Sequence, residues 1–305
     1  GLKPVWIWKM MDKTKGAFWI TGSNGMLGKE IGSLLKELDI PFYSTGRDCD
    51  ITDEASLKSF ASGKNIGCII NCAAYTKVDK AEEEPGKAYA INSLGPGSLA
   101  RLAERNGMQM VHISTDYVFD GTVREGYLEN HQGNPLSVYG RTKLEGEYQV
   151  RKWMQDYYII RTSWLYGIHG KNFLLKMLEI MNERDVIQVV DDQHGSPTYA
   201  CDLARFILFL LDSGKPHGIY HFTNEGETTW HGFACRIYHE GKISGILDRE
   251  CDIRPVSSDE YESKAKRPKF SRLLQSKALD YPSNRSWEES LRLCIDKLKT
   301  MKFNL

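Results

Sequence analysis

The sequence lacks a net charge, and it lacks any apolar run long enough to span a bilayer. Its 305 residues contain 40 Lys and Arg and 40 Asp and Glu, so the formal charge is zero. Because no overall field would attract nucleic acid or an anionic membrane, we expect neither as a partner. The apolar stretch from Val5 to Trp8 is far shorter than a membrane span or a signal-peptide core. We therefore interpret residues 1–16 as a disordered N-terminal extension.

The sequence also lacks paired cysteines. None of its seven cysteines forms a CxxC pair, and no group of cysteine and histidine has the spacing of a zinc site. An odd number of scattered cysteines is typical of reduced thiols, so we expect a cytoplasmic protein without structural disulfides. The cysteines are Cys49, Cys68, Cys72, Cys201, Cys235, Cys251 and Cys294.

No internal repeat is visible, and the first half of the chain instead alternates short apolar runs with amphipathic stretches. The apolar runs predict strands at residues 17–21, 42–45, 66–72, 108–114 and 157–163. The amphipathic stretches predict helices at residues 26–38, 88–105 and 138–154. Strands that alternate with helices form right-handed βαβ units around a parallel sheet. The predicted fold class is therefore α/β, with a Rossmann-like doubly wound parallel sheet in residues 17–165.

The second half has a less regular rhythm. Helices are predicted at residues 173–183, 202–211 and near 287–299, with short strands at 187–190 and 219–222. We predict that residues 166–305 form mostly a smaller α/β substrate-binding lobe, with some segments returning to the first domain. A cleft between two such lobes is a common place for a ligand.

A glycine-rich turn follows the first predicted strand directly. Gly22, Gly25 and Gly28 are spaced as GxxGxxG, which differs from the general GxGxxG fingerprint. Residues without a Cβ allow the backbone to turn tightly and to approach a pyrophosphate, and the following helix points its N-terminus at the phosphates. The turn therefore predicts a dinucleotide site, while a purely structural strand–turn–helix connection is the alternative.

The end of the second predicted strand bears on the choice between NADP and NAD. NAD sites usually place an acidic side chain there to bind the ribose hydroxyls. Arg47 occupies this position, and its planar guanidinium suits the 2′-phosphate of NADP, although Asp48 follows directly. NADP(H) is the expected cofactor, with NADH as the alternative. Asp50 and Ile51 are candidates to receive the adenine ring.

Tyr139 and Lys143 are four residues apart on a predicted helix, so both side chains lie on one face. A free tyrosine has a pKa of about 10, which is too high for efficient acid–base work at neutral pH. A neighbouring ammonium favours the phenolate, so we predict that Lys143 lowers the pKa of Tyr139. The preceding predicted strand ends in Ser114 and Thr115, whose hydroxyls could bind a carbonyl oxygen.

These features together resemble the extended short-chain dehydrogenases/reductases, and within them the dTDP-4-dehydrorhamnose reductases. The resemblance covers nearly all of the chain after Gly16. The segments that carry it are residues 71–82, 112–119, 139–143, 161–167, 192–198 and 267–268.

The resemblance implies an NADPH-dependent enzyme that reduces the 4-keto group of a dTDP-6-deoxy-L-hexulose to dTDP-L-rhamnose. It implies a catalytic trio of Thr115, Tyr139 and Lys143, in which Tyr139 protonates the forming alkoxide and Thr115 hydrogen-bonds the same oxygen. The predicted cofactor-binding residues are Gly22, Gly25, Met26, Leu27, Arg47, Asp50, Ile51, Ala74, Tyr75, Thr76, Tyr139 and Lys143. The implied substrate-binding residues are Thr115, Asp116 and Trp164.

One departure from the family concerns metal. Some members bind a divalent ion between subunits through glutamates. Glu30 matches one such position, but Cys201 stands where another is expected. We therefore predict no metal site and leave a homodimer as an open alternative.

Several alternatives stay open at this point. On spacing alone Trp164 could be a core residue, and Arg267 could be a surface residue or could pair with a substrate diphosphate. The chain could also be a nucleotide-sugar epimerase or dehydratase that retains NAD, which would not consume added NADPH. A third alternative is a non-catalytic, NADP-binding regulatory subunit resembling the methionine adenosyltransferase beta chain. The presence of Thr115, Tyr139 and Lys143 favours chemistry.

Overall fold

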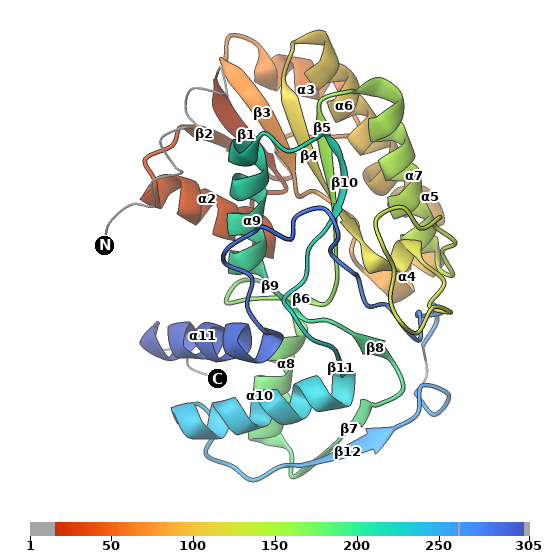
Figure 1. Cartoon of the computed structure of the whole chain (residues 1–305), viewed down its shortest axis with the longest axis vertical. Coiled ribbons are helices and arrows are strands. Elements are labelled where there is room, and N and C mark those ends of the chain that lie inside the picture. Colours follow the sequence, from red (N-terminus) through yellow and green to blue (C-terminus); the bar gives the residue numbers. More distant parts are fainter. Residues whose placement is uncertain (1–15, 262, 302–305) are drawn as a thin grey trace.

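A six-stranded parallel sheet forms the centre of the larger, upper part of the molecule (Figure 1). The computed structural model describes residues 16–261 and 263–301, so the extension predicted over residues 1–16 lies outside the described residues except for Gly16. The sheet order is β10–β5–β4–β3–β1–β2, and every neighbouring pair is parallel. The strands are β1 (Ala17–Thr21), β2 (Phe42–Thr45), β3 (Ile66–Asn71), β4 (Gln109–Thr115), β5 (Tyr157–Thr162) and β10 (Gly218–His221). The predicted α/β fold with a doubly wound parallel sheet is thereby confirmed.

Helices cover both faces of this sheet, because successive side chains of each strand alternate between two hydrophobic cores. Phe18 and Ile20 of β1 pack in one core with α2 and α9. Trp19, between them in sequence, packs in the other core with α3, α6 and α7. The helices are α2 (Met26–Glu37), α9 (Ala200–Ser213), α3 (Glu54–Ala61), α6 (Gly95–Arg105) and α7 (Val138–Trp153).

The helix predicted over residues 88–105 is divided into three elements. They are α5 (Pro85–Tyr89), the π-helical turn η1 (Ala90–Leu94) and α6. Pro96 in the first turn of α6 has no N–H to donate, which favours a change of hydrogen-bonding pattern just before it. Single π turns within helices are frequent at functional sites, and this one places Asn92 in the interior.

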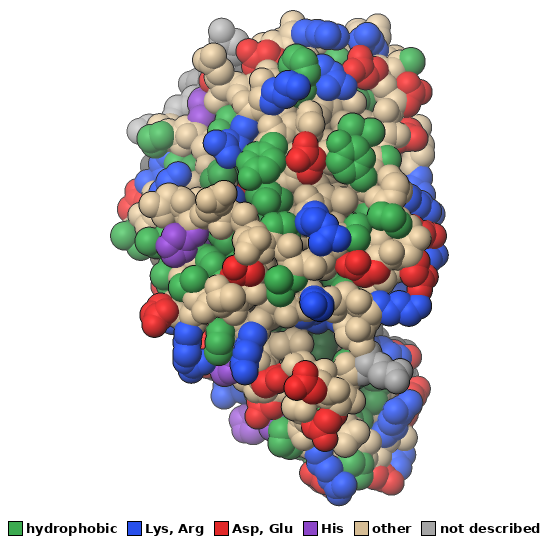
Figure 2. Space-filling model, turned by 90° about the vertical axis from the view of Figure 1, so that its right-hand side faces the viewer, with side chains coloured by type: hydrophobic (Ala, Val, Ile, Leu, Met, Phe, Trp, Pro, Cys, Tyr) green, Lys and Arg blue, Asp and Glu red, His purple; other side chains and the backbone are tan. Residues whose placement is uncertain are grey.

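A smaller lobe lies below the sheet domain and has its own core (Figure 1). Its helices are α8 (Phe173–Glu183), α10 (Trp230–Ser244) and α11 (Trp287–Thr300). Its short strands are β6 (Leu165–Tyr166), β7 (Val186–Val190), β8 (His194–Gly195), β9 (Thr198–Tyr199), β11 (Thr228–Thr229) and β12 (Asp252–Val256). Figure 2 shows that this lobe is narrower than the sheet domain and that the surface is indented where the two meet.

Two segments late in the sequence lie in the sheet domain. Strand β10 extends the sheet beside β5, and α9 packs against α2. Among the described residues, no helix is both long and apolar enough to cross a bilayer. All seven cysteines are free thiols.

Candidate active site

The candidate site lies at the carboxyl ends of β1, β3 and β4. Strand β1 lies between β2 and β3, so the chain reverses its direction of travel across the sheet at this point. In open α/β sheets ligands bind in the crevice outside such a switch point. The glycine-rich turn, the 3₁₀ turn η2 (Asp116–Val118) and the short helix α4 (Val78–Glu83) follow these three strand ends.

The backbone after β1 passes too close to its neighbours for side chains. Gly22 has a φ of 64°, and a Cβ there would lie 2.5 Å from the backbone nitrogen of Ala73. A Cβ on Gly28 would lie 2.7 Å from the carbonyl oxygen of Gly22. Glycine is therefore required at both positions, which explains the GxxGxxG spacing.

The N-terminus of α2 fits a pyrophosphate. Gly25 caps the helix without any side-chain hydrogen bond, and the first turn contains no acidic residue. Its free N–H groups and the positive end of the helix dipole suit an anion. Met26 in this turn packs against Gly167. A Cβ added at Gly167 would lie 3.4 Å from the sulfur of Met26. The first turn of α2 therefore also contacts the segment that follows β6.

The predicted adenosine end lies at the end of β2 and just beyond it. Arg47 is exposed and forms no ion pair with any residue in the described part of the chain. The carboxylate of Asp48 accepts a hydrogen bond from the Gly46 N–H at 2.7 Å, so its charge is directed into its own turn. Asp50 likewise accepts from Thr52, and Ile51 is buried in the core. This geometry leaves Arg47 as the residue available to a 2′-phosphate.

The opposite side of the predicted cofactor site is held by Asn92, which the sequence reasoning missed. Its amide oxygen accepts from the Tyr75 N–H at 2.8 Å, and its amide nitrogen donates to the Tyr75 carbonyl at 3.1 Å. The same nitrogen donates to the Thr142 hydroxyl on α7. Tyr75, between Ala74 and Thr76, is thus linked through Asn92 to α7, the helix that carries Tyr139. Only the three-dimensional fold reveals this, because the π turn that positions Asn92 has no sequence signature.

A second buried network joins the strand ends. Thr21 of β1 donates to the side-chain oxygen of Asn71 at 2.7 Å, and the Asn71 amide lies 3.0 Å from Nδ1 of His112 on β4. Burial, together with the Lys143 ammonium, holds the pKa of His112 well below its usual range. His112 is therefore neutral and acts as an acceptor for Asn71.

The structure places two of the predicted catalytic residues side by side and the third one helical turn away. Thr115 is the last residue of β4, and its hydroxyl lies next to the phenol of Tyr139, which is in the first turn of α7. Ser137 caps this turn by accepting from the Gly140 N–H. Lys143 lies one turn further along and donates to the Ile113 carbonyl on β4 at 2.5 Å. The cap and the strand together fix the helix that carries both residues.

The pKa of Tyr139 differs in direction from the prediction. Burial and the nearby Asp116 raise it to about 12, while the hydrogen bond with Thr115 opposes them. The predicted lowering by Lys143 is wrong, because the lysine points to the Ile113 carbonyl instead of the phenol. Tyr139 thus keeps its proton at neutral pH, which is the state that a proton donor needs.

Lys143 is nearly fully buried, and burial lowers its pKa to about 8 while Glu147 and Cys72 oppose the shift. Glu147 in turn forms a buried, two-point ion pair with Arg161, at 2.9 and 2.7 Å. Ser114 donates to the same carboxylate at 2.5 Å. A buried pair of this kind is strongly destabilising when one partner is removed. Ser114 therefore belongs to this buried support beneath Thr115.

The predicted sugar side of the site contains Asp116 and Trp164. Burial raises the pKa of Asp116 to about 6, against the hydroxyls of Ser271 and Thr115. Trp164 has a φ of 47°, which is unusual for a bulky residue, and it stacks on Trp230 at 3.7 Å. Such outliers often occur at ligand sites, where the surrounding structure enforces them. Trp230 was not predicted, because its segment has no strong helical pattern.

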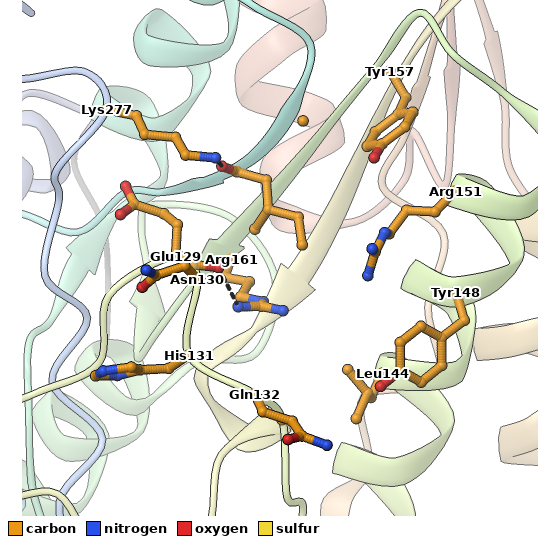
Figure 3. A pocket seen from close by; sticks show the side chains of 13 residues that line it. Glu129, Asn130, His131, Gln132, Leu144, Tyr148, Arg151, Tyr157, Arg161 and Lys277 are labelled. Carbon is orange, nitrogen blue, oxygen red and sulfur yellow. Dashed lines mark hydrogen bonds between the residues drawn. The ribbon is translucent and has the colours of Figure 1, made fainter.

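A cavity lies elsewhere, on the other flank of α7 (Figure 3). It measures about 370 Å³ and is lined by Arg151, Arg161 and Lys277 among others. Lys277 donates to the Ile219 carbonyl, and Glu129 accepts from Ser276. None of the predicted cofactor, substrate or catalytic residues lines this cavity, so we do not assign it to the reaction.

Metal ligands are not clustered in the described ranges, 16–261 and 263–301, where no group of three or more His, Cys, Asp or Glu side chains could hold an ion. Glu30 is buried and lies 3.7 Å from the ammonium of Lys297 on α11. The lysine, and not a second carboxylate, is the charged partner that the structure provides for Glu30.

Comparison with known proteins agrees with this geometry. The family model described as RmlD substrate binding domain matches residues 17–300. A dTDP-4-dehydrorhamnose reductase of Streptomyces griseus is 40% identical over 280 residues, covering 89% of this chain and 90% of its relative. A dTDP-4-keto-6-deoxy-D-glucose reductase of Streptomyces niveus is 39% identical, with 83% and 86% covered. The crystal structure of a Bacillus anthracis dTDP-4-dehydrorhamnose reductase in complex with NADP is 37% identical, with a TM-score of 0.88 over 93% of this chain and 99% of that one. The chain therefore belongs to the dTDP-4-dehydrorhamnose reductase family.

Proposed function

We propose that this protein uses NADPH to reduce the 4-keto group of a dTDP-linked 6-deoxy-L-hexulose, giving dTDP-L-rhamnose. The observation that carries the proposal is the meeting of Thr115, Tyr139 and Lys143 beside a glycine-rich turn that fits a pyrophosphate. The names of the related reductases and the NADP in the Bacillus anthracis structure support it.

Cofactor binding follows from the shape of the turn. Gly22 and Gly25 allow the pyrophosphate to approach, while the N–H groups of Met26 and Leu27 lie in the open first turn of α2. Arg47 binds the 2′-phosphate, and Lys143 holds the nicotinamide ribose. When bound, NADPH supplies the hydride that reduces the keto carbon.

The chain's own residues manage the oxygen and its proton. As negative charge develops on the keto oxygen, Tyr139 transfers its phenolic proton to it, and the Thr115 hydroxyl donates a hydrogen bond to the same atom. The raised pKa of Tyr139 keeps the proton in place until this moment. Asp116 and Trp164 bind the sugar, with the indole forming an apolar wall for the 6-deoxy carbon.

The direct test is NADPH oxidation with the dTDP-keto sugar, with the same sugar lacking its nucleotide, and with a UDP-linked keto-hexose. We expect rapid turnover only with the first, because burying one methyl group contributes only about 0.8 kcal/mol and the nucleotide must supply most of the affinity. Equal rates with the free sugar would contradict the proposal. Activity without consumption of added NADPH would indicate an epimerase or dehydratase with retained NAD.

A second substrate has specific support among the relatives. The Streptomyces niveus relative is named as a reductase of a dTDP-4-keto-6-deoxy-D-glucose, which differs from the proposed substrate in stereochemistry. The D-configured sugar is therefore the second compound to assay. A higher kcat/KM with it than with the L-hexulose would move the assignment to that neighbouring activity.

A further inference from the structure

The short helix α4 carries two carboxylates to which the catalytic geometry above assigns no role. Asp79 and Glu82 are three residues apart, so both lie on one face of this helix. Glu82 accepts a hydrogen bond from the Val138 N–H at 2.8 Å, one residue before Tyr139. The carboxylate therefore caps the helix that carries the proton donor.

Asp79, the other carboxylate of α4, binds the segment around Arg267. It forms an ion pair with Arg267 at 2.8 Å, and it accepts a hydrogen bond from the Ala265 N–H at 3.1 Å. Although burial raises the pKa of Asp79, the hydrogen bonds from Ala265 and Arg267 outweigh it and lower the value. The carboxylate is thus held charged and bound to the segment around Arg267.

The guanidinium of Arg267 also lies beside the phenol of Tyr117, where its charge opposes the rise that burial causes in the pKa of Tyr117. The ring of Tyr117 stands edge-on to the ring of Tyr139, with centroids 5.5 Å apart and planes at 76°. Aromatic pairs prefer this arrangement, so Tyr117 restricts the position of the neighbouring phenol. Helix α4, Tyr117 and the segment around Arg267 are far apart in the sequence, and they meet next to the side chain of Tyr139 at the start of α7.

We propose that Arg267 is a positioning residue for Tyr139, and that α4 braces the proton donor at two points. Asp79 fixes Arg267, which fixes Tyr117 against the ring of Tyr139, while Glu82 fixes the backbone next to Tyr139. The inference rests on the proposed reduction, in which Tyr139 delivers a proton to a defined oxygen. A displacement of about 1 Å at such a group can lower turnover by on the order of 100-fold.

The test measures kcat and the KM for NADPH in Arg267→Ala and Asp79→Asn. We expect kcat to fall by about 10- to 100-fold, because proton delivery depends on orientation, while the KM for NADPH changes by less than about threefold. An unchanged kcat in Arg267→Ala would overturn the proposal. Wild-type protein that fails to reduce any keto sugar would instead contradict the proposed function, so the two failures are distinguishable.

The chain contains a matched control for simple tethering. Glu83 pairs with Lys264 between the same two segments, but the Lys264 side chain is 67% exposed whereas that of Arg267 is 22% exposed. Exposed pairs contribute little, so Glu83→Gln and Lys264→Ala should change kcat by less than about twofold. A loss as large as that of Arg267→Ala would mean that any tether of this segment suffices, and the positioning role would be rejected.

Two further variants separate positioning from folding. Glu82→Gln keeps an oxygen that can accept from the Val138 N–H, whereas Glu82→Ala removes it, so we expect near-normal kcat in the first and a loss in the second. Tyr117→Phe removes the hydroxyl that lies beside the Arg267 guanidinium. The double variant Tyr117→Phe/Arg267→Ala should then have nearly the same kcat and the same free energy of unfolding in urea as Tyr117→Phe alone. The reason is that residues in one network act non-additively. Fully additive losses would contradict a shared path through Tyr117.

Discussion

Helix α7 contains the same short motif twice, in opposite physical settings. Tyr139 and Lys143 are followed nine residues later by Tyr148 and Lys152, again a tyrosine and a lysine four residues apart. At about 100° per residue, nine residues rotate the second pair by about 180° from the first. Lys143 is buried against β4, whereas Tyr148 is 44% exposed and Lys152 lies over the exposed ring of Trp153.

The comparison teaches that spacing alone does not make a catalytic pair. On the first flank, burial and named partners shift the pKa of both groups and aim them at one strand end. On the second flank, Tyr148 and Arg151 border the cavity of Figure 3, which none of the predicted site residues lines. The difference arises from which side of α7 faces the carboxyl end of β4.

The largest expected difference in kcat is between variants of the two tyrosines of α7, Tyr139 and Tyr148. Tyr139→Phe should reduce kcat by at least about 10²- to 10⁴-fold, since the mutation removes the general acid but retains the ring. NADPH affinity should change little. The matched change Tyr148→Phe should leave kcat within about twofold, because an exposed hydroxyl far from the strand end takes no part in the reaction. Comparable losses in both variants would remove the distinction between the flanks.

The glutamates of α7 offer the second comparison. Glu147→Gln leaves the charge of Arg161 buried without its partner, so the free energy of unfolding should fall by about 3–5 kcal/mol. Glu145 accepts a hydrogen bond from the neighbouring Gln149, and Glu145→Gln should alter the free energy of unfolding by less than about 0.5 kcal/mol. Urea unfolding followed by circular dichroism measures both. A small effect of Glu147→Gln would mean that water replaces the lost carboxylate.

Two exposed arginines provide the third comparison. Arg47 and Arg151 both form no ion pair with another residue in the described ranges, yet only Arg47 lies at the predicted 2′-phosphate position. Arg47→Ala should reduce the preference for NADPH over NADH by about 10- to 100-fold, since a charge-assisted hydrogen bond contributes about 1.5–3 kcal/mol. Arg151→Ala should leave the ratio unchanged. Equal use of both cofactors by the wild type would contradict the role of Arg47.

The sheet was predictable from the sequence because its strands are short apolar runs with turn residues at their ends. Helix α7 was also predictable, and so was the placement of Tyr139 and Lys143 on it. The pKa of Tyr139 was not, because it depends on Asp116 and on the direction of the lysine, which are set by packing. Spacing therefore identified the pair but not its electrostatics.

Helix α10 and strand β12 were not predicted from the sequence, and the reasons are physical. Helix α10 contains Gly232 and Gly241, which weaken a helix by about 1 kcal/mol each, and it is stabilised by packing in the core of the smaller lobe. Strand β12 contains Pro255, which argues against a central strand but is acceptable in a two-stranded edge pairing with β7. Asn92 acts through partners distant in sequence, so no local pattern indicates it. Arg267 was a candidate from the sequence, but its ion pair with Asp79 depends on the fold.

The last comparison is between the two lysines of α7, Lys143 and Lys152. Here the expected effect is on the pH dependence of kcat/KM for NADPH. Burial lowers the pKa of Lys143 from its usual value of 10.5 to about 8, so the ammonium is present at pH 7 and is lost as the pH rises through about 8. If the charged form holds the nicotinamide ribose, kcat/KM for NADPH should fall about tenfold per pH unit above that value. Tyr139 does not interfere, because its pKa of about 12 lies well above this range.

The profile of Lys143→Arg separates this cause from others, since arginine keeps its charge throughout the range. Its activity should be lower overall, because the longer side chain cannot reproduce the contact with the Ile113 carbonyl, but it should show no fall near pH 8. Lys152→Met, on the opposite flank, should keep the wild-type profile. A wild-type profile that stays flat to pH 10 would mean that the charge on Lys143 is not needed for cofactor binding. The two flanks of α7 would then differ in their tyrosines alone.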